Sequence, residues 1–157
     1  IFLTCNHCGK IYELTPEGFM KATTGKTEYK HIPDWFNWQR EEIKKDILED
    51  KYNLDIPVEI YMLVNTKAIY KVGYGNLQHN KNGFVLDGCD GKLHYEQKPS
   101  SSYSLYSDYY WYEIGDVICI GDMKTLYYCF PQTEQDVVAR SRIATEEIFK
   151  LCQNNEI

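Results

Sequence analysis

The clearest metal chemistry in the sequence lies in the stretch CNHCG at residues 5–9, which carries Cys5 and Cys8. Two cysteines three positions apart, followed by a glycine, are typical of a zinc ribbon, in which two such pairs give a structural zinc ion its four ligands. No second Cys-x-x-Cys occurs in the sequence. We therefore predict that Cys5 and Cys8 are metal ligands of an incomplete zinc site, and that a single chain binds zinc weakly or not at all.

Three sources of further ligands remain open at this stage. His7 lies inside the cysteine turn, and His31 reaches it only if the intervening segment folds back. A second cysteine pair can also lie upstream, because the first residue, Ile1, already stands in an apolar stretch and the chain is therefore expected to be a fragment of a longer protein. We favour the upstream pair, so residues 1–29 are expected to be held by packing or to be frayed.

The four histidines are the other candidates for chemistry. A general base needs a pKa near neutrality and a partner within hydrogen-bond reach. The best pair is His94 with Glu96 on one strand face, where residues two apart are about 7 Å from each other along the strand. That is too far for a direct bond unless both side chains lean together. We therefore expect structural or solvated histidines, no catalytic residue and no cofactor-binding residue beyond the cysteine pair.

The composition excludes several classes of function. The chain has 157 residues and a net charge of −6, and its 17 basic residues form no cluster, so nucleic acid and anionic membrane surfaces are disfavoured as partners. No apolar run approaches the roughly 18 residues of a membrane span, and no secretory signal is present. The other cysteines stand in strand-like or helix-like runs. We read them as reduced buried thiols of a cytoplasmic protein.

The elements that would position the cysteine pair are short. Residues 1–29 predict a strand, the cysteine turn, a second strand, a turn and a short returning strand. Residues 33–50 then predict a helix with Asp34 as N-cap and an apolar stripe of Phe36, Ile43 and Ile47, widened by Leu48. The tryptophans at 35 and 38 lie on an adjoining side, where they either pack on the next domain, which we favour, or form a membrane-interface anchor or partner site.

From residue 56 the apolar pattern has a period of two. Turn signals separate seven predicted strands, at 58–65, 67–79, 83–88, 91–98, 101–108, 110–121 and 125–130. Gly73 and Gly75 stand where the second strand changes parity, which predicts a β-bulge or sharp coil. The aromatic stretch from 101 to 122 predicts paired strands in preference to a peptide or acyl-chain groove.

The final segment predicts a helix. Thr133 and Asp136 resemble a capping box, and an apolar stripe follows, made of Val137, Ala144, Ile148 and Leu151. Seven strands and then one helix is the element order of the pleckstrin-homology-like fold. The predicted class is therefore α+β and mostly β, with half a zinc ribbon at 1–29, an amphipathic linking helix at 30–55, and a seven-stranded antiparallel bent barrel at 56–157 that the last helix caps.

Five stretches together carry a family resemblance: CNHCGKIYEL, HIPDWFNWQREEIKKDI, GFVLDGCDGKLHYEQKP, SLYSDYYWYEIGDVICIGD and LYYCFP. They resemble the C-terminal region of bacterial 1-acyl-sn-glycerol-3-phosphate acyltransferases, and the resemblance covers nearly the whole chain. It implies that an acyltransferase domain precedes this region and that the ribbon's first cysteine pair lies just upstream. Only Cys5 and Cys8 match functional positions of that group, as zinc ligands.

The catalytic motif of that group, His-x4-Asp, has no counterpart here. The residues five positions after the four histidines are Tyr12, Phe36, Phe84 and Pro99. We therefore expect a non-catalytic accessory module of phospholipid synthesis, in an intact protein that is an acyltransferase and is membrane-peripheral at most. It would dock on the upstream acyltransferase domain or bind lipid. The alternative is a protein-binding module with no lipid role and a peptide ligand.

Overall fold

The chain divides into two compact units, residues 1–42 and residues 43–157. The computed structural model describes residues 1–5, 8–65, 68–101, 109–111, 114–122, 124–133 and 137–157. The helix α1 (Ile32–Leu48) begins in the first unit and ends in the second. In the described part of the chain, no helix combines the length and the apolar character needed to cross a membrane.

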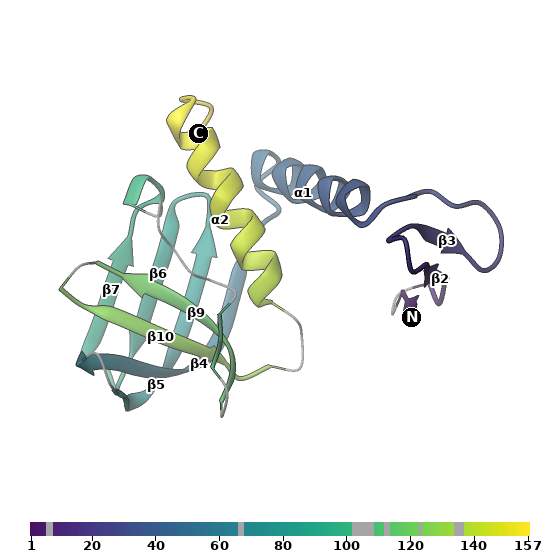
Figure 1. The fold of residues 1–157 in the computed structure, drawn as a ribbon. Helices are drawn as coiled ribbons and strands as arrows, with labels where there is room; N and C mark the ends of the chain where they lie inside the picture. Colours follow the sequence, from purple (N-terminus) through teal and green to yellow (C-terminus); the bar gives the residue numbers. More distant parts are fainter. Residues whose placement is uncertain (6–7, 66–67, 102–108, 112–113, 123, 134–136) are drawn as a thin grey trace. The chain divides into compact units, whose positions relative to one another are not determined.

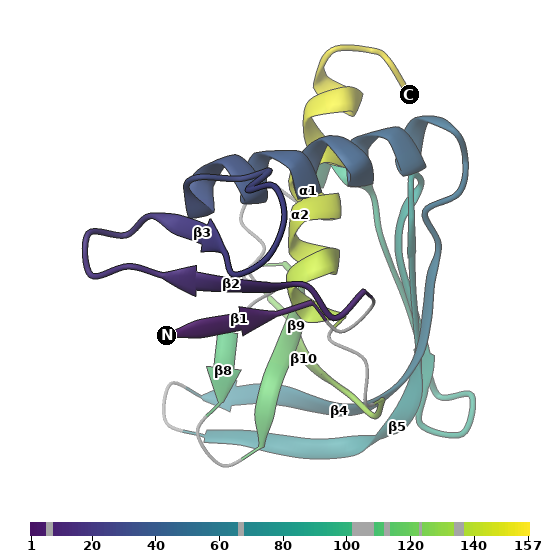
Figure 2. The same cartoon turned by 90° about the vertical axis from the view of Figure 1, so that its right-hand side faces the viewer.

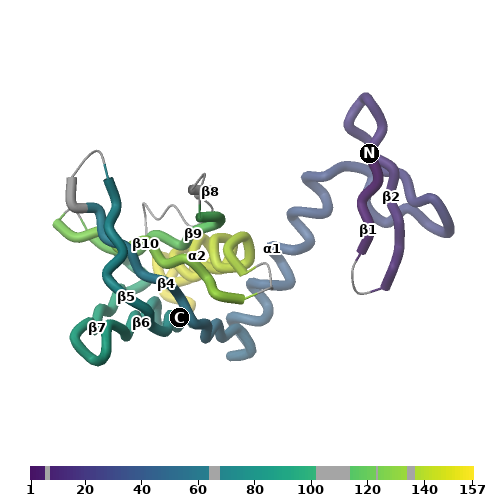
Figure 3. Tube along the Cα trace, turned by 90° about the horizontal axis from the view of Figure 1, so that it is seen from below, coloured from purple at the N-terminus to yellow at the C-terminus, as the bar shows by residue number. Residues whose placement is uncertain are grey.

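The first unit is built on a three-stranded antiparallel sheet in the order β1 (Phe2–Thr4), β2 (Ile11–Leu14), β3 (Met20–Ala22). The strands lie where the sequence predicts them, and β1 and β2 run side by side (Figure 3). Leu3, Tyr12 and Ala22 are in register across the three strands. Because facing residues share one side of a sheet, they give this small sheet an apolar face.

The first half of α1 belongs to this unit and begins two residues earlier than the predicted N-cap. Asp34 lies inside the first turn, where its carboxylate still faces the positive end of the helix dipole. Ile43 and Ile47 are buried as expected, but Phe36 and Leu48 are 41% and 50% exposed. The predicted apolar stripe is therefore confirmed at Ile43 and Ile47, and its two ends at Phe36 and Leu48 are exposed.

The second unit contains an antiparallel sheet whose strands follow the order β7-β6-β5-β4-β10-β9, with the three-residue strand β8 paired to β9 (Figures 1 and 2). The strands are β4 (Leu54–Asn65), β5 (Ala68–Asn80), β6 (Gly83–Gly88), β7 (Leu93–Gln97), β8 (Tyr109–Trp111), β9 (Gly115–Gly121) and β10 (Leu126–Pro131). Among the described residues no pairing joins β7 to β8. The fold is thus α+β and mostly strands, but the sheet is open, and the predicted barrel is not confirmed.

The bend in the sheet is located where the sequence predicts it. The β4–β5 register shifts between Ile60 and Tyr61, which face Gly73 and Lys71, so Val72 is the extra residue of a bulge. Nearby, the backbones of β5 and β6 approach closely at Gly75 and Gly88. A Cβ on Gly75 would lie 2.3 Å from the Asp87 carbonyl oxygen and 2.7 Å from the Ile60 Cδ1.

Two strand predictions require correction. The run 110–121, predicted as one strand, is the antiparallel pair β8–β9, with Trp111 facing Gly115. Gly115 has a φ of +123°, which glycine adopts without steric cost and which allows the chain to reverse there. The predicted strand 101–108 begins with Ser101 in the 3₁₀ turn η1 (Pro99–Ser101), and the rest of it lies outside the described residues.

The last helix, α2 (Val138–Gln153), packs on the sheet of the second unit (Figures 1 and 2). Its N-cap residue is Val137, which makes no side-chain cap hydrogen bond. The predicted capping box of Thr133 and Asp136 lies partly outside the described residues. The predicted apolar stripe is confirmed, because all four of its residues are buried, in one core with Ile43, Ile47 and the central strands.

Candidate metal site and adjoining pocket

The cysteine pair stands on a hydrogen-bonded loop between β1 and β2, which we call the knuckle (residues 5–9). The Cys5 amide donates to the Lys10 carbonyl and the Gly9 amide donates to the Cys5 carbonyl, both at 2.8 Å. Gly9 has a φ of +70°, a conformation that costs other residues about 1–2 kcal/mol. Cys5 and Cys8 are both exposed. Two backbone hydrogen bonds therefore join the ends of the segment that carries the two accessible thiols.

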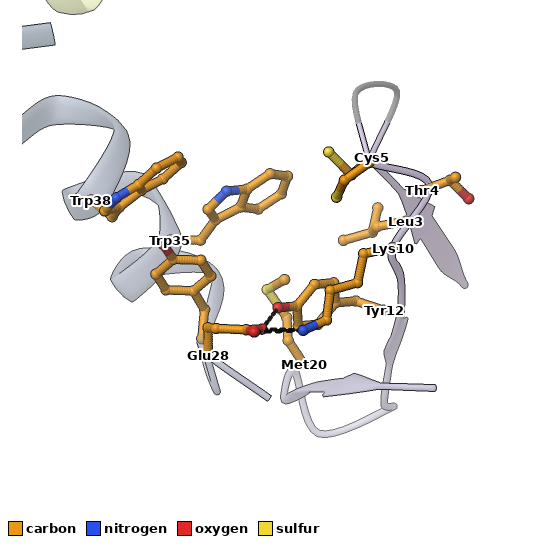
Figure 4. A pocket seen from close by; sticks show the side chains of 11 residues that line it. Leu3, Thr4, Cys5, Lys10, Tyr12, Met20, Glu28, Trp35 and Trp38 are labelled. Atoms are coloured by element: carbon orange, nitrogen blue, oxygen red, sulfur yellow. Dashed lines mark hydrogen bonds and ion pairs between the residues drawn. The ribbon is translucent and has the colours of Figure 1, made fainter. Parts of the chain in front are cut away.

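A pocket of about 290 Å³ adjoins the knuckle within the first unit. Figure 4 shows Cys5 and Leu3 on one side of it and Trp35 and Trp38, from α1, on the other. Both thiol residues line it, and the remaining lining is mostly aromatic or apolar: Tyr12, Met20 and Tyr29. The Tyr29 and Trp38 rings lie 5.6 Å apart. This surface favours an apolar or aromatic group placed beside the two sulfurs.

A charged network closes the base of the pocket (Figure 4). The Lys10 ammonium contacts both Glu28 carboxylate oxygens, at 2.6 and 2.5 Å, and donates to the Lys26 carbonyl at 2.7 Å. The Tyr12 hydroxyl donates to the same carboxylate. Hydrogen bonds from Lys10 and Tyr12 lower the pKa of Glu28 to about 2, and the same pairing raises the pKa of Lys10. The network is exposed to solvent, so it fixes geometry more than it adds stability.

The donors at the knuckle fit half of a tetrahedral zinc site. Zinc takes four ligands in structural sites, and thiolates are among those it prefers. Within the described residues no group of three or more His, Cys, Asp or Glu side chains is arranged to hold a metal. The His31 ring contacts the Phe19 ring in a tilted arrangement, with centroids 4.8 Å apart, and His7 lies outside the described residues.

The remaining cysteines all belong to the second unit. Cys119 and Cys129 are buried, and burial raises the pKa of both thiols. Cys89 and Cys152 are half-buried, so the prediction of buried thiols is correct for two of the four. Cys119 faces Tyr128, and Cys129 faces Ile118, so the two buried thiols are offset by one residue in the register. Such an offset places them on opposite faces of the sheet.

The structure corrects the interpretation of His94. Its Nε2 lies 3.0 Å from the Glu96 Oε1, and its Nδ1 lies 2.5 Å from the Asp87 Oδ1 on the neighbouring strand. The side chains of His94 and Glu96 do lean together. Asp87, on the neighbouring strand β6, directly faces His94 and holds the ring from the other side. The two carboxylates, Asp87 above all, raise the pKa of His94. Two neighbouring carboxylates favour the cationic form of a histidine, and in that form neither ring nitrogen has a lone pair with which to act as a general base.

His79 has the structural role that the sequence predicts, but in a buried setting. It is 1% exposed, its Nδ1 lies 2.9 Å from the Tyr52 hydroxyl, and its ring stacks on Phe84 at 3.7 Å. Burial lowers its pKa from 6.5 to about 3. His79 is therefore a neutral core residue.

Sequence reasoning identified the two thiols and missed the pocket beside them. The signal was the set of aromatic residues on three separate segments, at positions 12, 29, 35 and 38. Periodicity within one element cannot show that residues from three segments surround a common space. No protein-family model, no curated protein and no solved structure matches this chain.

Proposed function

We propose that this chain is a non-catalytic docking module of a 1-acyl-sn-glycerol-3-phosphate acyltransferase-like enzyme, in which Cys5 and Cys8 supply two of the four ligands of a structural zinc ion. The observation that carries the proposal is the pair of exposed thiols on a hydrogen-bonded knuckle beside an apolar pocket. Zinc in such a site acts as a cross-link and contributes folding energy, not catalysis. The family resemblance over nearly the whole chain supports the link to acyl transfer.

Docking on protein is favoured over binding to a lipid surface. The net charge is −6, and peripheral membrane binding usually depends on clustered basic residues near anionic lipid. The pocket beside the knuckle is small and aromatic, and the one lysine that lines it is already paired with Glu28. The second unit is compatible with a pleckstrin-homology-like fold, since seven consecutive antiparallel strands precede a helix that packs on them. Folds of this kind serve as binding modules as readily as enzymes.

The described histidines support a non-catalytic role. His79 is buried and neutral, His94 is bonded to two carboxylates, and His31 makes a tilted ring contact with Phe19. The experiment is an acyl-transfer assay with lysophosphatidate and an acyl thioester, together with sedimentation on vesicles of anionic phospholipid. We expect no turnover and no co-sedimentation. Turnover that His94→Ala abolishes would contradict the non-catalytic role, and vesicle binding that survives physiological salt would favour a lipid ligand instead.

The zinc part of the proposal has its own test. We expect the reduced chain to bind zinc only weakly, because it supplies two of the four ligands, and either Cys5→Ser or Cys8→Ser to lose that binding. Cys152→Ser is the matched control, because that thiol is also partly accessible but stands in α2, in the other unit. Zinc binding that persists in both knuckle variants would remove the metal from the proposal.

A further inference from the structure

The pocket of the first unit has an aromatic end that the proposed zinc role does not use. Trp35 and Trp38 stand on α1, and Tyr29 belongs to the segment that precedes this helix. The Tyr29 and Trp38 rings lie 5.6 Å apart at an angle of 37°, so they form two walls of one corner. Figure 4 shows the two tryptophan rings next to each other on one side of the pocket. Three aromatic rings thus surround a small space.

Two carboxylates make this aromatic end electrically negative. Positions 35, 38 and 42 share one face of an α-helix, so Glu42 follows the two tryptophans on that face of α1. Glu28 lines the pocket and adjoins Tyr29 in the chain. Partial burial, followed by the charges of Glu28 and Glu42, raises the pKa of the Tyr29 hydroxyl. The field of these carboxylates therefore favours a positive group beside the Tyr29 ring.

The pocket already holds one cation against an aromatic ring at its base. The Lys10 ammonium lies 5.5 Å from the centroid of the Tyr12 ring, within the roughly 6 Å of a cation–π contact. This lysine is paired with Glu28, so its own charge is balanced there. The charges that act on Tyr29 are nonetheless those of the two carboxylates. The base and the aromatic end of the pocket are thus electrically distinct.

We infer that the aromatic end of this pocket binds the trimethylammonium group of a small cation of the choline class, with Tyr29, Trp35 and Trp38 as its walls. Aromatic faces attract such a group electrostatically. It has no N–H, so it leaves no unpaired donor among apolar side chains, whereas a primary ammonium would leave up to three. The volume of about 290 Å³ suits a small ligand. This inference goes beyond the zinc role and does not depend on it.

The carboxylates also select between two sources of the trimethylammonium group. A phospholipid headgroup carries a phosphate close to its ammonium, and that phosphate would approach Glu28 and Glu42, which repel it. The one lysine that lines the pocket is already paired. A molecule with a net positive charge therefore fits this end better than a zwitterionic headgroup.

The test compares three compounds that share a size. They are choline, the uncharged carbon isostere dimethylbutanol, and ethanolamine, which keeps the charge but lacks the methyl groups. Each is titrated into the reduced chain, with tryptophan fluorescence as the measure of affinity and proton NMR contacts between ligand methyls and indole rings as the measure of position. Choline should bind about tenfold more tightly than either, which corresponds to about 1.4 kcal/mol. Equal affinity for either analogue would overturn the inference.

Variants of α1 locate the binding. Trp38 is 46% exposed, so its replacement should leave the fold intact. Trp38→Ala should weaken choline binding about tenfold, and Trp38→Phe should restore most of it because a ring is kept. Glu42→Gln should weaken it less. Phe36→Ala is the matched control, since Phe36 stands on the same helix, is 41% exposed and does not line the pocket. Unchanged binding in Trp38→Ala would overturn the inference.

Two further outcomes keep this inference separate from the rest. Phosphocholine should bind more weakly than choline, and an equal or higher affinity would overturn the choice of a small cation in favour of a lipid headgroup. Choline that does not bind at all would overturn the inference and leave the zinc role of the knuckle in place, because the thiol variants test that role alone.

Discussion

Two histidines of the second unit lie in opposite electrostatic surroundings. His79 is buried against Phe84 and bonded to Tyr52, and burial lowers its pKa to about 3. His94 lies exposed between Asp87 and Glu96, which raise its pKa. Burial thus favours the neutral form of His79, and the two carboxylates favour the charged form of His94. This difference gives the residues distinct pH signatures.

The pH signature of His79 predicts acid sensitivity. Its pKa falls from 6.5 in the unfolded chain to about 3 in the fold. Its contribution to the free energy of unfolding is therefore complete above pH 6.5 and is lost as the pH falls toward 3. Each unit of pKa difference corresponds to about 1.4 kcal/mol. Urea unfolding at pH 7.5 and pH 5 should show this loss. The variant His79→Gln should be less stable at pH 7.5, and its free energy of unfolding should change less between the two pH values.

Proton NMR of the two histidines provides the control. The His94 ring should titrate above the ordinary value of 6.5, while the His79 ring should stay neutral well below it. The contribution of His94 to the free energy of unfolding depends on pH in the opposite direction. It is present at low pH and is lost as the pH rises through the raised pKa. A His79 ring that titrates near 6.5 would contradict its burial as a neutral side chain.

The sequence was a good guide to which residues could do chemistry and a poor guide to the distances between them. The knuckle cysteines are recognisable from spacing alone, because metal chemistry restricts which residues can serve. The His94–Glu96 contact was judged too long from strand geometry, since the sequence does not show that Asp87 on the facing strand holds the ring from the other side. Cross-strand partners are set by register, which the sequence does not give directly.

At the scale of elements, the close approach of β5 and β6 depends on two glycines. Gly75→Ala would place a methyl group 2.3 Å from the Asp87 carbonyl oxygen, and that atom is backbone and cannot rotate away. We expect a loss of about 2–3 kcal/mol in the free energy of unfolding. Thermal and urea unfolding of the purified variant measure it.

Gly91→Ala separates steric overlap from backbone strain. Gly91 has a φ of +79° but nothing within 4 Å of an added Cβ, so it should lose only the roughly 1–2 kcal/mol of the left-handed conformation. The account of the bend fails if Gly75→Ala is no more destabilising than this control.

The last helix contributes to the core through one buried face. Ile148 is 1% exposed and lies in the main core with Ile143 and Leu151. Ile148→Ala should therefore cost about 2–5 kcal/mol of stability. Arg142→Ala on the exposed side of the same helix removes an i,i+4 ion pair with Glu146, and the loss of such a pair costs about 0.5 kcal/mol or less. Similar losses in both variants would contradict the packing of α2 on the sheet.

Periodicity located most elements but not their ends. The stripe from Val137 to Leu151 and the bulge beside Gly73 are confirmed because each rests on a strong local signal. The last helix begins at Val138, because polar residues before a helix need not lie at its first turn. The reversal before Gly115 was missed because one glycine inside an apolar run also fits an uninterrupted strand.

At the scale of the whole molecule, the second unit begins at Ile43. Ile43, Ile47 and Tyr52 precede residue 56, where the barrel was expected to start, yet all three belong to the main core. Tyr52 also bonds to His79, and Arg140 of α2 lies 3.6 Å from Asp46. The end of α1 is therefore an integral part of this unit. The period-two pattern marked the first strand but not the helix end that completes the core.

Two fragments test this boundary. Residues 43–157 should unfold cooperatively with nearly the stability of that unit in the whole chain, because they keep the main core intact. Residues 56–157 should be less stable by several kcal/mol, since burying one large apolar side chain contributes about 1.5–3 kcal/mol. Circular dichroism against urea compares the two. Equal midpoints would mean that α1 contributes nothing to the second unit.

The central claim is that Cys5 and Cys8 bind the metal together and that the other cysteines do not. The most direct test is alkylation of the folded, reduced chain with iodoacetamide, with and without zinc, followed by mass spectrometry of the peptides. Zinc should protect Cys5 and Cys8 to the same extent and leave the rates at Cys89 and Cys152 unchanged. Alkylation of the knuckle pair at the same rate with and without zinc would contradict the account.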